Sequence, residues 1–494
     1  MFTLLLTVSI LTTSVIHPFL SEKLATLKNG EMIEIIVHMK NRMDLTKLPI
    51  TFSKNDKINY LKEFADADQK DLLEYLANFT NQIFELRTYW IFNGLYLKTT
   101  KDVVNNIASR SDISYITGNY TVSIDSVEFS KMSSTRSFGY NIRIIKADSC
   151  WNEGYDGSGV IIGNIDTGVD TTHPALRGKW HPGGWYDAVN GLPGPYDDHG
   201  HGTFTIGIIC GGDGNGPFED DIGIAPGAKY IVAKAFDSLG AATYTALHNC
   251  LQWFATQNAK MVNNPWNESD NISLEFWDDC LNLRNLGIFP VFKGGALNSG
   301  QIRTPGNFPT VIGVGATDSL DDIMWYSGRG PAPNQSPWND SSYWYRSDWN
   351  LIKPDIAAPG QNIRSSWPGG YDISNGTSWA ASHVTGACAI LLQKDTSLTP
   401  TGLYNILLDN ADNPPQGAPY PNIDYGWGRL NVYAALHALR VNEETPKEFL
   451  CNWLLIQTHF TKKYISIIGC SRTMKVRLIK SYVRSKFTMP PAGC

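Results

Sequence analysis

The chain has 494 residues, a formal net charge of −6, 42% hydrophobic residues and 18% charged residues. This composition excludes a disordered chain, and the length is too great for one compact core, so we expect two or three domains. A net negative charge does not indicate a protein that binds nucleic acid through an overall basic charge. We therefore expect a globular protein whose partners are not nucleic acids.

The N-terminus carries an apolar run over residues 4–16, within "MFTLLLTVSILTTSVIHPFLS". The run is short for a membrane span and favours a secretory signal peptide over residues 1–21, although no Lys or Arg precedes it. A buried N-terminal strand is the alternative. Several glycosylation sequons agree with export, among them those at Asn78, Asn119, Asn267, Asn271 and Asn339.

Eight cysteines fit a secreted protein without defining a disulfide framework. Cys250 and Cys280 are plausible partners, although pairing cannot be deduced from sequence. Cys210 and Cys388 lie in apolar helical runs and are interpreted as small buried hydrophobes.

Residues 30–120 are predicted to form a small α+β unit. Strand patterns cover residues 31–39 and 113–117, helical spacing covers 57–79 and 101–110, and two strands over 86–100 meet at Asn93-Gly94, a hairpin signal. The order strand, helix, hairpin, helix, strand matches a ferredoxin-like pattern. The polar, Ser-rich segment 126–139 that follows is interpreted as an exposed linker.

Buried strands and helices then alternate. Near-continuous apolar runs, as expected of buried parallel strands, cover 160–165, 229–236, 260–264, 288–292 and 311–316. Helical stretches lie between them, for example over 243–256 and 276–287. The alternation predicts an α/β domain with a parallel central sheet. The tail over residues 446–494 is basic, with no Asp or Glu after Phe449; it could contact a membrane surface or polyanion, or be a poorly ordered appendix.

Three residues of complementary chemistry each stand at a predicted junction of strand or loop with helix. Asp166 ends the run "VIIGNID", His201 lies in "DDHGHGT", and Ser378 opens the helical stretch "SWAASHVTGACAILL". In parallel sheets such positions meet beyond the carboxyl ends of the strands. A hydroxyl becomes a nucleophile when an imidazole accepts its proton, and a carboxylate fixes the imidazole tautomer.

Each of these residues has a structural alternative. Ser378 could be only a helix cap and Asp166 only a turn cap. His201 could join His199 and Asp198 in a metal cluster, but no further ligand spacing supports one.

Three blocks, "NIDTGVDTTHP", "DDHGHGT" and "NGTSWAASHVTGA", together resemble the catalytic blocks of the subtilisin-like serine proteases, in that family's order Asp, His, Ser. The segments "WYDAVNGLPGPYDDHGHGT", "GIAPGAKYIVAKAF" and "IRTPGNFPTVIGVGATD" are similar to the bacillopeptidase F type. The resemblance implies a subtilisin-like parallel sheet flanked by helices over residues 126–445. It also implies that residues 22–125 are a propeptide resembling the family's inhibitor and chaperone domain. By the same resemblance Asp166 orients, His201 is the general base and Ser378 attacks.

The chain departs from the family pattern at the oxyanion position. Gly294 and Gly295 precede Ala296, which stands where the family has an Asn that donates to the developing oxyanion; Asn298 could substitute if the loop is rearranged. Loss of that donor costs about 10²–10³ in turnover, a figure measured on subtilisin itself. We therefore expect a slow protease.

Other departures concern the groove. By resemblance Asn264, Pro265, Trp266 and Asn267 line the peptide-binding groove, and Asn267 should narrow it because the family has Gly there. Phe204 stands for a His and Ser382 for a Pro, both interpreted as packing changes. Lys293, near the implied specificity pocket, could favour acidic side chains or simply be solvated.

We expect a secreted, monomeric serine endopeptidase made as a zymogen, acting on protein or peptide substrates and inhibited by its own propeptide. No organic cofactor or metal site is predicted; structural calcium is common in the family, but the sequence indicates no site for it. The alternative is a catalytically impaired peptide-binding protein or decoy of the same fold. Ala296 and the altered groove favour that alternative, whereas the intact Asp, His and Ser set disfavours it.

Overall fold

The computed structural model describes residues 15–124, 139–213, 221–295 and 300–444, which belong to one compact unit. None of the helices in these ranges is both long and apolar enough to cross a lipid bilayer. The predicted linker, the basic tail and most of the predicted signal peptide lie outside the described residues.

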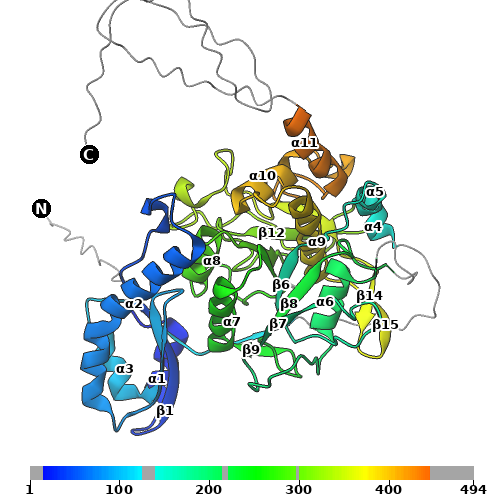
Figure 1. Cartoon of the computed structure of the whole chain (residues 1–494). Coiled ribbons are helices and arrows are strands. Elements are labelled where there is room, and N and C mark those ends of the chain that lie inside the picture. The colour runs from blue at the N-terminus through cyan, green and yellow to red at the C-terminus, as the bar shows by residue number, and fades with distance from the viewer. Residues whose placement is uncertain (1–14, 125–138, 214–220, 296–299, 445–494) are drawn as a thin grey trace, which may run out of the picture. The chain divides into compact units, whose positions relative to one another are not determined.

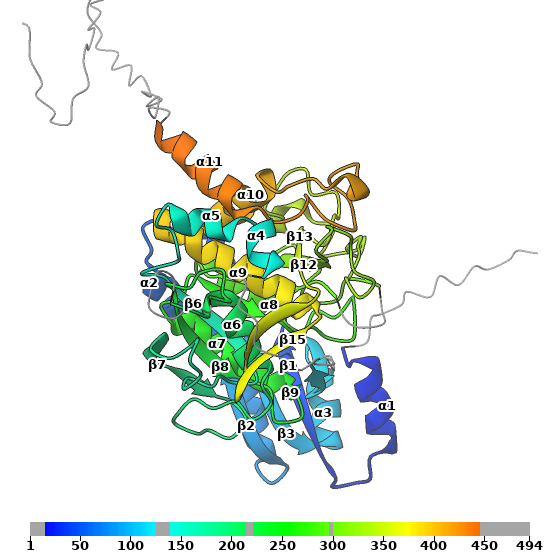
Figure 2. The same ribbon diagram turned by 90° about the vertical axis from the view of Figure 1, so that its right-hand side faces the viewer.

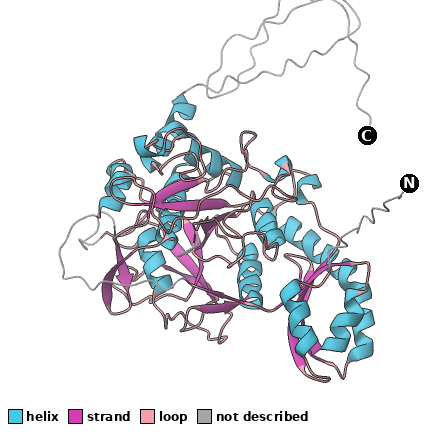
Figure 3. Ribbon diagram, turned by 180° about the vertical axis from the view of Figure 1, so that it is seen from behind, coloured by secondary structure: helices cyan, strands magenta, loops and turns pink. Residues whose placement is uncertain are grey.

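The N-terminal part contains a four-stranded antiparallel sheet in the order β2-β3-β1-β4. Its elements are α1 (Pro18–Thr26), β1 (Met32–Met39), η1 (Leu45–Lys47), α2 (Lys54–Leu76), η2 (Ala77–Phe79), β2 (Ile83–Tyr89), β3 (Gly94–Thr100), α3 (Lys101–Ala108) and β4 (Ile113–Gly118). The helix and strand order from β1 to β4 is the predicted ferredoxin-like one. Figure 3 shows this sheet with its helices. Helix α1 continues across the predicted signal boundary after Ser21, and its Leu20 is fully buried.

Local sequence explains where these elements begin and turn. Ser53 and Asp56 form a capping box that starts α2, each side chain accepting from the other's backbone N–H. Asn93 has a left-handed φ of 50° at the hairpin, as the Asn-Gly signal predicts. The next position requires glycine, because a Cβ at Gly94 would lie 2.3 Å from the carbonyl oxygen of Val37.

The larger part is built on a seven-stranded parallel sheet in the order β13-β12-β11-β10-β6-β8-β7, which confirms the predicted α/β class. Its strands are β6 (Ile161–Asp166), β7 (Trp180–Asp187), β8 (Lys229–Lys234), β10 (Met261–Asn264), β11 (Phe289–Lys293), β12 (Ile312–Thr317) and β13 (Ile356–Pro359). Figure 1 shows β6, β8 and β7 side by side. The edge strands β7 and β13 were not predicted, nor was the antiparallel pair β14 (Ile363–Trp367) and β15 (Gly370–Ser374).

Helices cover both faces of this sheet. Helices α6 (His201–Cys210) and α9 (Thr377–Lys394) share one core cluster with the sheet, while α7 (Tyr244–Thr256) and α8 (Trp277–Asn285) share another. The remaining helices are α4 (Tyr140–Ile144), α5 (Ala147–Asn152), η3 (Ser341–Tyr343), α10 (Pro400–Asp409), η4 (Pro415–Gly417) and α11 (Val432–Glu444). Figure 2 shows α11 beside α5, in agreement with their contact.

The antiparallel sheet is packed against other elements on both of its faces. Ile35 and Val37 of β1 belong to a core shared with α1, α2 and α3, whereas Ile36, between them, belongs to the core of α7 and α8. This is the alternation expected of a strand buried on both faces. In addition, β5 (Thr121–Ser123) pairs with β9 (Ala241–Thr243) in antiparallel register. The N-terminal part is therefore packed against the α/β part.

The cysteine expectations had mixed outcomes. Cys210 and Cys388 are fully buried, which confirms that interpretation. The suggested pairing of Cys250 with Cys280 is wrong, because both are buried free thiols, as are the other three described cysteines. Burial in an apolar core raises the pKa of both thiols.

Candidate active site

Asp166 and His201 meet at the carboxyl end of β6. Asp166 is the last residue of β6, His201 is the first of α6, and both are buried. His201 Nδ1 lies 2.7 Å from Asp166 Oδ1. Because a carboxylate oxygen accepts, Nδ1 carries the proton and Nε2 is left as the acceptor. Asp166 Oδ2 accepts from Thr205 Oγ1 at 2.9 Å, so both carboxylate oxygens are held.

His201 Nε2 is buried and has no hydrogen-bond partner among the described residues. Ser378 is the second residue of α9 and is buried as well. Its Oγ donates to the carbonyl oxygen of Pro265 at 3.0 Å rather than to the imidazole. The geometry therefore presents a formed acid–imidazole pair and a serine hydroxyl that is engaged elsewhere.

Trp379 places the start of α9 against the imidazole. Its ring centroid lies 4.9 Å from that of His201 and 4.2 Å from that of Phe204, and the indole is fully buried. Since Trp379 directly follows Ser378, the start of α9 lies beside the His201–Asp166 pair. Phe204 is also fully buried, in agreement with a packing change at that position.

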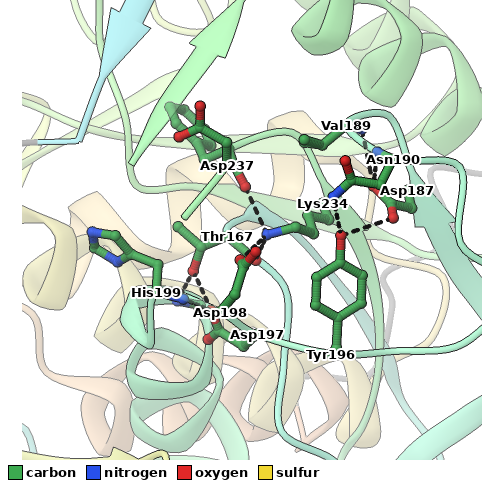
Figure 4. A network of polar contacts seen from close by, with 12 residues as sticks. Thr167, Asp187, Val189, Asn190, Tyr196, Asp197, Asp198, His199, Lys234 and Asp237 are labelled. Carbon is green, nitrogen blue, oxygen red and sulfur yellow. Dashed lines mark hydrogen bonds and ion pairs between the residues drawn. The ribbon is translucent and has the colours of Figure 1, made fainter. Parts of the chain in front are cut away.

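The loop before α6 is fixed by carboxylates and by a buried lysine, as Figure 4 shows. Asp197 accepts from the backbone N–H groups of His199, Gly200 and Thr203 and from Thr167 Oγ1. These bonds satisfy donors at the start of the helix that otherwise lack partners.

Lys234, at the end of β8, is fully buried. Its Nζ donates to the carbonyl oxygens of Thr167 (2.6 Å) and Phe236 (2.9 Å) and to Asp198 Oδ1 (2.6 Å). The ammonium thus ties the residue after Asp166 to the loop that leads to His201.

The metal alternative at His199 has no support in this geometry. Asp198 already pairs with Lys234, and the described ranges contain no group of three His, Cys, Asp or Glu side chains placed to hold a metal ion. Burial lowers the pKa of His199, and the neighbouring His201 lowers it further. His199 is therefore a neutral neighbour of the pair.

The four predicted groove residues Asn264, Pro265, Trp266 and Asn267 are all buried. Pro265 offers its carbonyl oxygen to Ser378. In contrast, the Trp266 side chain is fully buried against Phe236, Phe276 and Phe292. Asn264 and Asn267 are buried, and their amides donate to backbone carbonyl oxygens. The side chains of these three residues are therefore occupied by contacts within the protein.

Gly294 and Gly295 follow β11 and are buried. A Cβ on Gly295 would lie 2.2 Å from the backbone N of Gly328, so this close approach requires glycine. The carbonyl oxygen of Gly295 accepts from Thr377 Oγ1 at 2.9 Å, which ties the strand end to the residue before Ser378. Ala296 and Asn298 lie outside the described residues.

Sequence reasoning missed several residues of the site. Lys293 is buried rather than solvated, at 1% exposure. Lys234 and Thr205 had a usable signal, since a charged or polar residue inside an apolar run needs a buried partner. Trp379 stands next to Ser378 in the quoted motif, but its contact with His201 depends on how α9 packs against α6.

Comparison with known proteins agrees with this geometry. The family model described as the subtilase family matches residues 157–428, more than half of the chain. Bacillopeptidase F of Bacillus subtilis (strain 168) is 31% identical over 429 residues, which cover 77% of this chain and 28% of that protein. The chain thus matches less than a third of the length of that relative.

Shorter relatives are matched over nearly their whole length. Subtilisin DY of Bacillus licheniformis is 30% identical over 303 residues, covering 60% of this chain and 97% of that protein. Subtilisin Savinase of Lederbergia lenta is 29% identical over 301 residues, covering 61% and 99%. The chain therefore belongs to the subtilase family of serine-type endopeptidases.

Proposed function

We propose that this chain is a secreted serine endopeptidase in which Asp166, His201 and Ser378 form the catalytic triad. The observation that carries the proposal is the buried His201–Asp166 pair, whose Nε2 has no partner among the described residues and whose ring packs 4.9 Å from that of Trp379, the residue after Ser378. Ser378 Oγ attacks the scissile carbonyl carbon, and its proton passes to His201 Nε2 and then to the leaving amine. Water hydrolyses the acyl-enzyme by the same route.

The hydrogen bond between Ser378 and Pro265 must break before Ser378 can attack a substrate. Its hydroxyl donates to the Pro265 carbonyl oxygen, so attack requires a change of the Ser378 side-chain rotamer toward His201. Rotamer changes of this kind are small motions on a fast timescale. With Ala296 in place of the family's amide donor, we also propose that turnover is slow.

We further propose that residues 22–125 are an inhibitory propeptide, so that the chain is a zymogen. In support, β5 adds to β9 as an extra antiparallel strand, and the backbone N–H of Ile124 donates to the carbonyl oxygen of Gly240 at 2.8 Å. A Cβ on Gly240 would lie 3.0 Å from His199 Nε2 and 3.6 Å from the Cβ of Ile124. The segment thus occupies a strand edge beside the site, where an extended peptide substrate would add.

Export and glycosylation are part of the same proposal, with one restriction. Asn267 is buried and donates to the carbonyl oxygen of Glu268, so a folded chain cannot carry a glycan there. Asn78 and Asn339 are exposed, so a glycan can be attached at either.

A non-catalytic peptide-binding protein is the second candidate. It is favoured by the bond from Ser378 to Pro265, which leaves the imidazole without its serine. Labelling with a fluorophosphonate probe after removal of residues 22–125 decides between the two. We expect labelling of the wild type and none of Ser378→Ala; a folded wild type that stays unlabelled would support the non-catalytic candidate.

A further inference from the structure

A branched chain of buried, uncharged hydrogen bonds runs between the strand that ends in Asp166 and the helix that bears Ser378. Its centre is the amide of Asn263 on β10, which is fully buried. Asn263 Nδ2 donates to Asn164 Oδ1 at 2.9 Å and to Ser382 Oγ at 3.3 Å. Its Oδ1 accepts from Thr385 Oγ1 at 3.2 Å. All polar atoms of this side chain therefore have partners.

The first branch leads to the catalytic carboxylate. Asn164 lies on β6 directly beside Asn263 in the parallel register. Its Nδ2 donates to Thr205 Oγ1 at 3.1 Å, and Thr205 Oγ1 donates to Asp166 Oδ2 at 2.9 Å. The single Thr205 hydroxyl proton has two acceptors in reach, Asp166 Oδ2 at 2.9 Å and the carbonyl oxygen of Gly202 at 3.0 Å. When it is directed at the charged carboxylate, every donor along this branch points toward the negative charge and the bonds polarise one another.

The second branch leads to the nucleophile. Ser382 lies one turn after Ser378 on α9, and its Oγ donates to the Ser378 carbonyl oxygen at 2.9 Å. By resemblance a proline belongs at this position, and a proline has neither a hydroxyl nor a backbone N–H. The sequence alone indicated only a packing change at Ser382. The structure instead shows a side chain that joins the start of α9 to β10.

We propose that Asn263 and Ser382 are positioning residues of the hydrolytic reaction, holding Asp166 and Ser378 at a fixed separation through the two N–H groups of one amide. This inference rests on the roles proposed above for Asp166 and Ser378. Helix α9 and strand β6 have no covalent link near the site, so their relative position depends on such contacts. Displacement of a reacting group by about 1 Å can cost about 100-fold in rate.

The test compares the variant Ser382→Ala with two further variants on the same helix. All are measured in the mature enzyme, that is, after removal of the proposed propeptide. Ser382→Thr keeps the hydroxyl and serves as the rescue variant. Cys388→Ala removes a buried atom from α9, outside the hydrogen-bonded chain, and serves as the packing control. The kinetic constants kcat and KM for a peptide substrate, the rate of fluorophosphonate labelling and the melting temperature are measured for each.

In Ser382→Ala we expect kcat and the labelling rate to fall together by about tenfold, with KM within about twofold of wild type. Ser382→Thr should recover most of kcat, and Cys388→Ala should lower the melting temperature without changing kcat. Asn263→Ala, which breaks both branches, should lower kcat by about 100-fold where it folds. If it does not fold, Ser382→Ala decides alone.

Two results would overturn the inference, and they differ from failure of the proposed function. Wild-type kcat in folded Ser382→Ala overturns the positioning role while leaving the triad intact. So does an equal loss of kcat in Cys388→Ala. A wild type that neither hydrolyses peptides nor reacts with the probe overturns the proposed function and the positioning role together.

Discussion

Two buried polar clusters lie on opposite faces of the central sheet, and they differ in charge. The cluster between the sheet and α9 consists of neutral amides and hydroxyls, centred on Asn263. The cluster beside α7 and α8 is ionic. In it, Glu275 Oε1 lies 3.2 Å from His38 Nε2 and 2.9 Å from His248 Nε2, and His248 Nδ1 lies 3.1 Å from both oxygens of Asp279.

The ionic cluster joins the N-terminal sheet to the α/β part, whereas the neutral cluster lies within the α/β part alone. His38 belongs to β1 of the N-terminal sheet, whereas His248 and Glu275 belong to the α/β part. Burial opposes the charge of Glu275, but His38 and His248 outweigh it and lower its pKa to about 2. Burial likewise opposes the charge of His248, but Asp279 and Glu275 raise its pKa to about 9.

The difference in charge decides how each cluster responds to pH. Neutral hydrogen bonds hold the site in the same way over a wide pH range. Buried ion pairs are stable only while both partners are charged, and losing one partner leaves a costly unpaired charge. The contact between the two parts of the chain therefore depends on pH, whereas the neutral cluster around Asn263 is built from amides and hydroxyls that do not change charge.

The largest effect is expected at Asp166, the carboxylate to which the neutral cluster is hydrogen-bonded through Asn164 and Thr205. Asp166→Asn should lower kcat by about 10⁴-fold, because the amide no longer accepts from His201 Nδ1 and the imidazole adopts the wrong tautomer. Steady-state kinetics on the mature enzyme measures the loss. Asp395→Asn, beyond the far end of α9, is the control and should keep wild-type kcat. A loss below about tenfold in Asp166→Asn would remove this residue from the triad.

The next largest effect is expected on the ionic side. Glu275→Gln leaves the His248 and His38 imidazoles without their shared carboxylate and should cost about 3–5 kcal/mol of unfolding free energy. Urea unfolding of the full chain measures the loss, with Ser378→Ala in the background to prevent self-cleavage. Glu63→Gln, on the exposed side of α2, is the matched control. Equal midpoints for both variants would show that the cluster contributes little.

The third prediction concerns pH. The folded pKa of Glu275 is lowered from 4.5 to about 2, so its contribution is present above pH 4.5 and is lost as the pH falls toward 2. The folded pKa of His248 is raised from 6.5 to about 9, so its contribution is complete below pH 6.5 and is lost as the pH rises toward 9. Relative to His248→Asn, the unfolding free energy should fall by about 1.4 kcal/mol per pH unit across that upper window. If the unfolding free energies of wild type and His248→Asn change in parallel with pH, the raised pKa of His248 is contradicted.

The smallest effect is expected at the aromatic contact with His201. Trp379→Leu should lower kcat by about tenfold, because the flat face that holds the imidazole is lost, whereas Trp379→Phe keeps a face and should lose about threefold or less. The comparison needs kcat, KM and melting temperatures for both variants. If Leu and Phe have the same kcat, then the contact only fills space.

The sequence by itself determined the elements whose signals are local. Apolar runs predicted five of the seven parallel strands, Asn93-Gly94 predicted the hairpin, and short motifs singled out Asp166 and His201, which form a pair in the structure. Such signals are local because periodicity and turn chemistry act over a few residues. The same patterns indicated the order of the N-terminal elements.

Only the tertiary structure decided which distant side chains meet. The edge strands β7 and β13 have weak local patterns, since β7 contains a proline and two glycines and β13 has four residues. The bond from Asn263 to Ser382 joins residues 119 positions apart, and Lys293 is buried although its sequence neighbours do not require it. Contacts of this kind depend on sheet register and helix packing, which no short stretch of sequence contains.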